Sequence, residues 1–138
     1  MLASLVRFFT RSWQNSAFRS PVQVPNFQMT VQEPNAVVVL TTVGESTDAT
    51  AFARVLVADR LAACVNVLPP MTSLYRWKGA IEEDREQQLV IKTTQDRVAA
   101  IEARFQELHP YELPEFVVLS AEASTAYLGW LRDCVAVK

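Results

Sequence analysis

Apolar residues recur along this chain with two spacings, and the changes of spacing predict where strands and helices alternate. The run from Asn35 to Thr42 is apolar and rich in β-branched residues, which is typical of a strand buried on both faces. After a turn at Gly44 we expect a helix capped by Ser46 or Thr47, with Asp48 in its first turn. The apolar face of this helix consists of Phe52, Ala53, Leu56 and Leu61.

The middle of the chain predicts a long, interrupted hairpin. The apolar strand Cys64 to Leu68 follows the helix almost directly, and Pro69-Pro70 interrupts its pairing because proline has no N–H to donate. An alternating strand then runs from Thr72 into a turn at Lys78-Gly79. The return strand is polar from Glu82 to Gln88 and apolar from Leu89 to Ile91. The distal half of the hairpin should therefore project away from the core.

The rest of the chain predicts a second helix, a strand and a last helix. Thr94 is expected to cap the second helix, and Pro110 ends it because the residue before a proline avoids the helical region. The strand is Phe116 to Leu119, and the last helix begins near Ser124. The complete order is the split β-α-β-β-α-β pattern of a ferredoxin-like fold with an added C-terminal helix, in the α+β class with an antiparallel sheet. Apolar residues at helical spacing are Val98, Ile101, Phe105 and Leu108 in the second helix, and Leu128, Leu131 and Val135 in the last.

The predicted sheet is apolar on both faces, although two helices cover only one of them. A solvated outer face would alternate with polar residues, and apart from Asn66 these strands do not. An exposed apolar sheet face is an association surface, and closed rings satisfy such contacts best. We therefore predict an oligomer, with the projecting hairpin paired to the edge of a neighbouring subunit.

Composition and charge narrow the class of protein and divide the chain. The 138 residues are 50% hydrophobic and have a net charge of −2, which gives no electrostatic case for binding nucleic acid. No apolar run approaches the roughly 18 residues of a membrane span. Residues 1–32 contain three arginines and no acid and form a leader, whereas residues 33–138 form the folded domain. We expect the leader to be disordered. In the alternative, residues 1–28 are a transit peptide. The expected location is thus cytoplasmic, with a mitochondrion or plastid as the alternative.

Six segments of this sequence resemble the CutA family of divalent-cation tolerance proteins, in the order and spacing of that family. The resemblance implies a compact homotrimer similar in shape to the PII regulatory proteins, and a role in tolerance of copper and other divalent metals. In animals it also implies an association with the anchoring of acetylcholinesterase. Some members have a cysteine in the first loop, where this chain has Val43-Gly44-Glu45. The segments are Arg60–Pro69 (RLAACVNVLP), Ser73–Gly79 (SLYRWKG), Glu82–Asp84 (EED), Ile91–Thr93 (IKT), His109–Glu115 (HPYELPE) and Tyr127–Leu131 (YLGWL).

Two residues are candidate metal ligands. His109 is the only histidine, and imidazole suits Cu(II); Cys64 is the only soft ligand in the predicted core. The two are too few for a closed site, and the helix dipole at His109 favours a protonated ring that binds no metal. The alternatives are that His109 fixes the following loop through hydrogen bonds and that Cys64 is a small core residue. The acidic run Glu82 to Asp84 is either a solvated face or a weak site for a hard cation.

A second set of residues is predicted to line a cleft shared with a neighbouring subunit. It mixes cations, aromatics and a carboxylate, which suits a small anionic ligand. The alternative is a network of salt bridges and aromatic contacts within a subunit interface. The set consists of Arg76, Trp77, Lys78, Lys92, Tyr111 and Glu112.

These observations favour a trimeric divalent-cation tolerance protein that binds copper or another divalent metal weakly. No glycine-rich phosphate loop, metal-binding motif or serine elbow occurs, so we expect no enzymatic activity and no required cofactor. The alternatives are a PII-like sensor of a small anionic ligand and a structural scaffold for other proteins.

Overall fold

A computed structural model describes residues 36–137, and the predicted leader lies outside the described residues. The elements follow the predicted order, with the second strand in two pieces. The interruption expected at Pro69-Pro70 is confirmed, because both prolines lie between those two pieces. The elements are β1 (Ala36–Gly44), α1 (Ala49–Ala58), β2 (Cys64–Val67), β3 (Met71–Trp77), β4 (Ala80–Thr94), a 3-10 turn (Gln95–Arg97), α2 (Val98–Leu108), β5 (Val117–Ala121) and α3 (Thr125–Val135).

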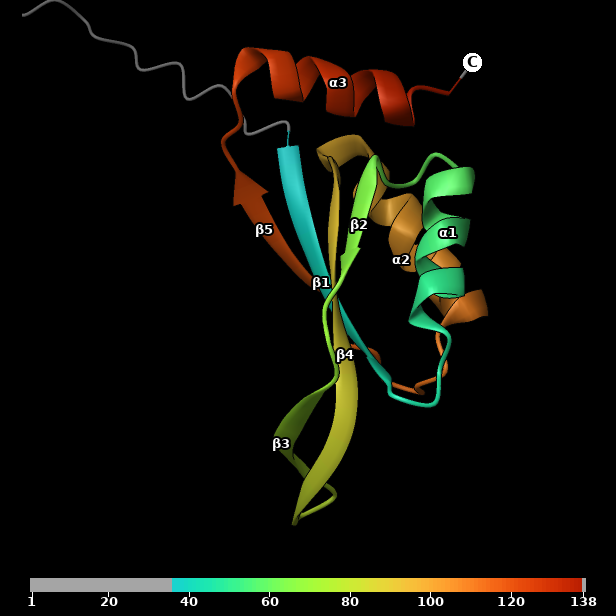
Figure 1. Cartoon of the computed structure of the whole chain (residues 1–138), viewed down its shortest axis with the longest axis vertical. Coiled ribbons are helices and arrows are strands. Elements are labelled where there is room, and N and C mark those ends of the chain that lie inside the picture. Colours follow the sequence, from blue (N-terminus) through green and yellow to red (C-terminus); the bar gives the residue numbers. More distant parts are fainter. Residues whose placement is uncertain (1–35, 138) are drawn as a thin grey trace, which may run out of the picture. The chain divides into compact units, whose positions relative to one another are not determined.

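One antiparallel sheet joins all five strands in the order β2-β4-β1-β5, with β3 also paired to β4. Strand β4 has 15 residues, so one half pairs with β1 and β2 while the other half pairs with β3. The β3–β4 hairpin therefore extends beyond the rest of the sheet (Figure 1). We call residues 71–86 the arm. The predicted α+β class and antiparallel sheet are confirmed.

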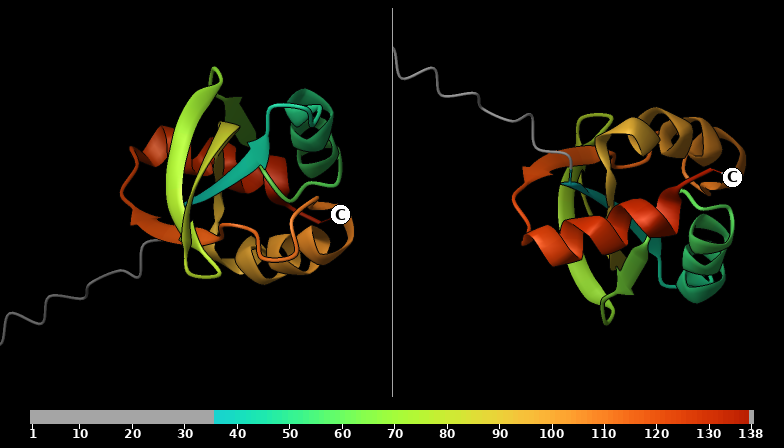
Figure 2. Two further views of the ribbon diagram at one scale, coloured as in Figure 1. Left: turned by 90° about the horizontal axis from the view of Figure 1, so that it is seen from below. Right: turned by 90° about the horizontal axis from the view of Figure 1, so that it is seen from above.

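Helices α1 and α2 lie on the same face of the sheet (Figures 1 and 2). Alternate residues of β1 and β4 point to this face, since side chains of a strand alternate between its faces. A cluster of buried apolar side chains fills the core between the helices and the sheet. It contains Val39, Val43, Ala49, Phe52, Ala53, Leu56, Ala62, Leu89, Ile91, Ile101 and Phe105.

No helix covers the opposite face of the sheet within the described residues. Val38 on β1 pairs with Leu119 on β5, and Leu40 pairs with Val117. Val117 and Leu119 are 42% and 47% exposed, so apolar surface reaches solvent where the sequence predicted it. Helix α3 lies across one end of the sheet, near the start of β1 (Figure 1). None of the described helices has the length and apolarity that crossing a bilayer requires.

Three local predictions about the helices were wrong. The cap of α1 is Asp48, whose Oδ1 accepts a hydrogen bond from the backbone N of Ala51 at 2.8 Å, in place of Ser46 or Thr47. Helix α1 ends at Ala58, so Leu61 packs against the core from the turn that follows the helix.

The third error concerns the start of the second helix. A 3-10 turn precedes α2, and Thr94 makes no capping hydrogen bond to the backbone. Its hydroxyl instead donates to the side chain of Asp96. At the last helix, by contrast, the predicted start is confirmed, because the Ser124 hydroxyl accepts from the backbone N of Tyr127.

Candidate functional site

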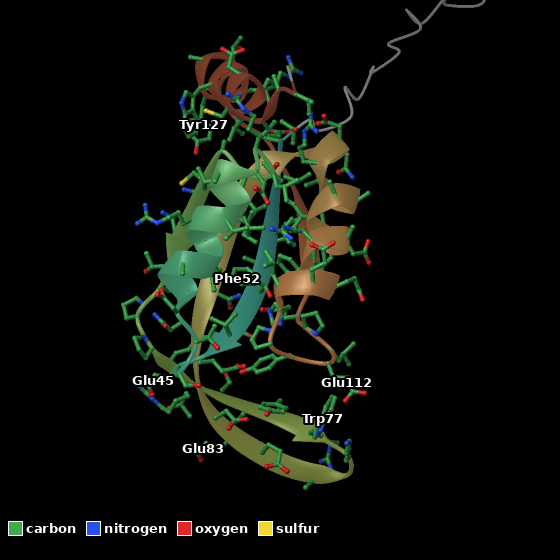
Figure 3. The ribbon with its side chains drawn as sticks, turned by 90° about the vertical axis from the view of Figure 1, so that its right-hand side faces the viewer. Glu45, Phe52, Trp77, Glu83, Glu112 and Tyr127 are labelled. Carbon is green, nitrogen blue, oxygen red and sulfur yellow. The ribbon has the colours of Figure 1, made fainter. Side chains whose placement is uncertain are left out.

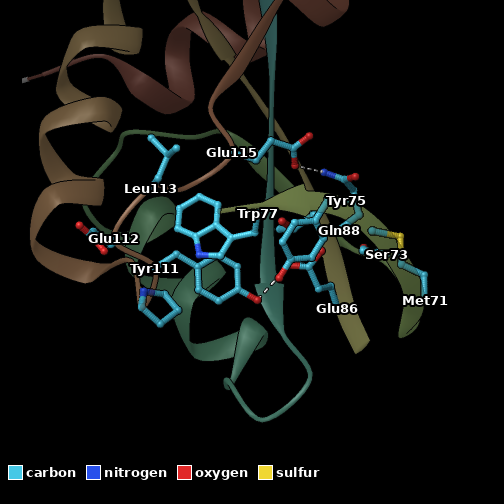
Figure 4. A pocket seen from close by; sticks show the side chains of 12 residues that line it. Met71, Ser73, Tyr75, Trp77, Glu86, Gln88, Tyr111, Glu112, Leu113 and Glu115 are labelled. Carbon is cyan, nitrogen blue, oxygen red and sulfur yellow. Dashed lines mark hydrogen bonds between the residues drawn. The ribbon is translucent and has the colours of Figure 1, made fainter. Parts of the chain in front are cut away.

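A cavity of about 610 Å³ lies between the arm and the loop of residues 109–116, which we call the His109 loop. The odd-numbered residues of β3 share one face of the arm, as strand alternation requires, and that face is turned toward the loop. Trp77 of the arm and Glu112 of the loop lie near each other at this place (Figure 3). The residues that line the cavity are Thr42, Met71, Ser73, Tyr75, Trp77, Glu86, Gln88, Pro110, Tyr111, Glu112, Leu113 and Glu115 (Figure 4).

Three aromatic rings form part of the cavity wall. Tyr75 and Trp77 come from β3, and Tyr111 comes from the His109 loop. The Tyr75 hydroxyl donates to Asp84, and this hydrogen bond raises the pKa of Tyr75 to about 12. Burial, followed by its hydrogen bond to a carboxylate, raises the pKa of Tyr111 well above the usual value. Both phenols are therefore protonated hydrogen-bond donors at neutral pH.

Three carboxylates also line the cavity, and two of them are held in place. Glu86 is only 7% exposed, and its Oε1 accepts from the Tyr111 hydroxyl at 2.8 Å (Figure 4). Glu115 accepts from Nε2 of Gln88 at 2.9 Å, and the same nitrogen donates to the backbone O of Thr41 at 2.9 Å. Glu112 is exposed. Among the described residues, the lining contains no Lys, Arg or His side chain, so its charge is negative.

His109 is half-buried directly behind the cavity. Its Nδ1 accepts from the backbone N of Tyr111 at 3.2 Å, so the proton of the neutral ring is on Nε2, which lies 3.1 Å from the Thr41 hydroxyl. The ring also packs against Phe52, Phe105 and Tyr111. Burial lowers the pKa of His109, against the smaller opposing effects of Thr42 and Glu86. The expected preference for a protonated ring is thus reversed, because burial outweighs the helix end.

Cys64 lies on the other side of the sheet from His109. It pairs with Lys92, which pairs with Val38 on the face that the helices leave open. His109 contacts Thr41, which belongs to the helix-covered face of β1. Within residues 36–137, no group of three or more His, Cys, Asp or Glu side chains is placed to hold a metal ion. The described part of one chain therefore presents no closed metal centre, and the metal role of His109 and Cys64 stays a prediction.

The structure brings together three of the six residues predicted to form a cleft: Trp77, Tyr111 and Glu112. Arg76 belongs to the other face of β3, and Lys78 lies in the turn, with Nζ 5.7 Å from the centre of the Trp77 ring.

Lys92 lies farther away, because it pairs with Cys64 and Val38 at the opposite end of β4. Sequence reasoning missed Tyr75, Glu86 and Glu115 as lining residues. The alternation of side chains along β3 pointed to Tyr75, because Tyr75 lies two residues before Trp77 and therefore on the same face of the strand.

The architecture and the site define a class of protein: a small α+β protein with one antiparallel sheet, a projecting arm and an acidic, aromatic cavity beside it. A family model described as CutA1 divalent ion tolerance protein matches residues 37–134. The chain belongs to this family.

Individual relatives agree with this assignment. The divalent-cation tolerance protein CutA of Thermus thermophilus is 47% identical over 97 residues, which cover 70% of this chain and 94% of that protein. The human protein CutA is 46% identical over 83 residues, 59% of this chain, and the match spans about half (46%) of its length.

Solved structures of CutA proteins have the same fold. The CutA structure from Synechococcus elongatus superposes with a TM-score of 0.70 at 40% identity, covering 75% of this chain and 92% of that one. The CutA1 structure from Oryza sativa gives a TM-score of 0.71 at 30% identity, covering 75% and 96%.

Proposed function

We propose that this chain forms a homotrimer of ferredoxin-like subunits that acts in tolerance of divalent cations, and that it is not an enzyme. The sheet order β5-β1-β4-β2 supports the ferredoxin-like description. The observation that carries the assembly is the open sheet face, where Val117 and Leu119 are exposed beside Val38 and Leu40. A surface of this kind favours association with further copies of the chain.

Divalent metals, Cu(II) included, are bound weakly in this proposal. A single subunit offers His109 and Cys64 on opposite faces of the sheet, and both ring nitrogens of His109 already make hydrogen bonds. A metal would have to displace one of those bonds or use ligands repeated across subunits. Either requirement reduces affinity, which fits a protein that buffers or senses metal without holding it permanently.

Copper titration of the full chain tests the metal part of the proposal. His109→Gln keeps a polar side chain, and Cys64→Ala removes the thiol from the other face of the sheet. We expect weakened Cu(II) binding in at least one variant. If both variants bind with the stoichiometry and affinity of the wild type, neither residue is a ligand.

Light scattering at micromolar concentration tests the assembly separately. We expect three times the mass of one chain. A monomer mass would refute the trimer and leave the copper result unaffected.

The small-anion sensor is the second candidate function. Only Trp77, Tyr111 and Glu112 of the predicted cleft line the cavity, and the three cations predicted with them do not. The charge of the cavity therefore does not favour an anion. A scaffold role for other proteins, and a cytoplasmic or organellar location, stay predictions.

A further inference from the structure

We propose that the cavity between the arm and the His109 loop binds a small organic cation that carries a protonated amine. The ligand class is that of short aliphatic amines and diamines. The proposal does not depend on metal binding, because its groups are the rings and carboxylates of the cavity and exclude both His109 and Cys64.

The charge of the lining selects a cation. Glu86, Glu112 and Glu115 line the cavity without a Lys, Arg or His among the other lining residues. None of the ion pairs among the described residues includes these three carboxylates. The described lining residues thus present to the cavity three carboxylates that make no ion pair within the described part of the chain.

Glu86 is the anchor of the site. It is 7% exposed, and its one side-chain partner within the described residues is the Tyr111 hydroxyl, which binds Oε1. Its second oxygen, Oε2, has no side-chain donor among the described residues and is not one of their buried unpaired atoms, so it is open to the solvent of the cavity. A protonated amine that enters the cavity can donate to this oxygen and offset its charge.

The aromatic wall favours an organic cation over a metal ion. An ammonium group gains energy from an aromatic face within about 6 Å of the ring centre. The ring of Trp77 already attracts a cation in this way, since Nζ of Lys78 lies 5.7 Å from its centre. A metal ion instead needs several close ligand atoms, and no such group exists among residues 36–137. The volume, about 610 Å³, lies within the range of small-molecule sites.

Calorimetric titration of the full chain with 1,4-diaminobutane, in buffer with a chelator, tests the proposal. The chelator removes divalent metals, so a failure here is distinct from a failure of the metal proposal. Butanoate and 1,4-butanediol serve as the anionic and neutral probes of similar length. We expect the diamine to bind in the millimolar range or tighter, and the other two probes not to bind. Binding of butanoate as tight as that of the diamine, or no binding of the diamine at 10 mM, overturns the proposal.

Two carboxylate variants with the same change of charge locate the site. Glu86→Gln alters the buried anchor, whereas Glu83→Gln alters an exposed carboxylate that belongs to the other face of β4 (Figure 3). We expect Glu86→Gln to weaken binding of the diamine about tenfold or more, which corresponds to about 1.4 kcal/mol. Glu83→Gln should leave the affinity for the diamine within about twofold of the wild type.

A third variant tests the aromatic wall. Trp77→Leu should weaken binding of the diamine about threefold or more, which is the range of a partly exposed cation–π contact.

For the two carboxylate variants, equal affinities of Glu86→Gln and Glu83→Gln for the diamine would place binding elsewhere and overturn the assignment. Circular dichroism establishes that each variant is folded.

Discussion

His109→Ala should destabilise the protein through loss of its packing and hydrogen bonds. The change removes the acceptor for the Tyr111 backbone N–H and the partner of the Thr41 hydroxyl, and Thr41 is completely buried. Each hydrogen bond contributes about 1 kcal/mol net, and a buried group left unpaired adds to the loss. Ring contacts to Phe52 and Phe105, with centres 5.6 and 5.4 Å away, add about 0.5–1.5 kcal/mol each. Together these contributions predict a decrease of about 3–5 kcal/mol in the free energy of unfolding.

The same residue should make stability depend on pH with a definite sign. Burial lowers the pKa of His109 in the folded protein below its ordinary value of about 6.5. Between those two pKa values the unfolded chain binds more protons than the folded one, so the free energy of unfolding decreases as pH falls. The stability that the neutral His109 ring contributes is fully present above about pH 6.5, and it is lost as pH falls through the pKa of His109 in the folded protein.

Urea unfolding at a fixed protein concentration, from pH 7.5 to pH 5, measures both effects. His109→Gln is the matched control, because it keeps a donor and an acceptor but does not titrate. His109 is the only histidine, so this control removes the entire histidine contribution. An identical pH slope in wild type and His109→Gln would refute the buried neutral ring. A loss below about 1 kcal/mol in His109→Ala would refute the packing estimate.

Three further changes test other parts of the fold. Asp48→Ala removes the acceptor for the Ala51 backbone N–H and should cost about 1 kcal/mol in urea unfolding. Arg60 has φ 56°, so Arg60→Val should be less stable than Arg60→Gly by about 1 kcal/mol or more, since both lose the guanidinium but only valine resists this conformation. Leu119→Asp should lower the mass found by light scattering, whereas Ser120→Asp, on the other face of β5, should not; equal masses would exclude this face from self-association.

Much of the fold followed from periodicity because packing and pattern agree there. The β-branched run that forms β1 and the helical spacing of α2 each match a buried face that the structure provides. Pro69-Pro70 separates β2 from β3 for a purely covalent reason, the missing N–H. Asp48 was misplaced because several residues in a row suit a cap, and backbone geometry alone selects among them.

The cavity was predictable only in part. Alternation along β3 placed Tyr75 and Trp77 on one face. The approach of the His109 loop to that face depends on tertiary packing, which no local sequence pattern indicates. Within one chain, Lys92 lies far from Arg76, with which it was predicted to line a cleft shared between subunits. Arg76 pairs with Ile81, eleven residues from Lys92, which is about 36 Å at about 3.3 Å per residue. Glu86 was hidden within the polar stretch Glu82 to Gln88, whose other acidic members are exposed.

A chain of contacts connects the core with the cavity, and His109 stands in its middle. Its ring packs against Phe105 in the core, and its Nδ1 holds the backbone N of Tyr111. The Tyr111 hydroxyl in turn holds Glu86 in the cavity. Protonation of Nδ1 removes the acceptor that fixes Tyr111, and the negative charge of Glu86 favours that proton. The stability of the fold and the shape of the cavity therefore depend on the same ring. His109, a candidate metal ligand from the sequence, thus also has a structural role.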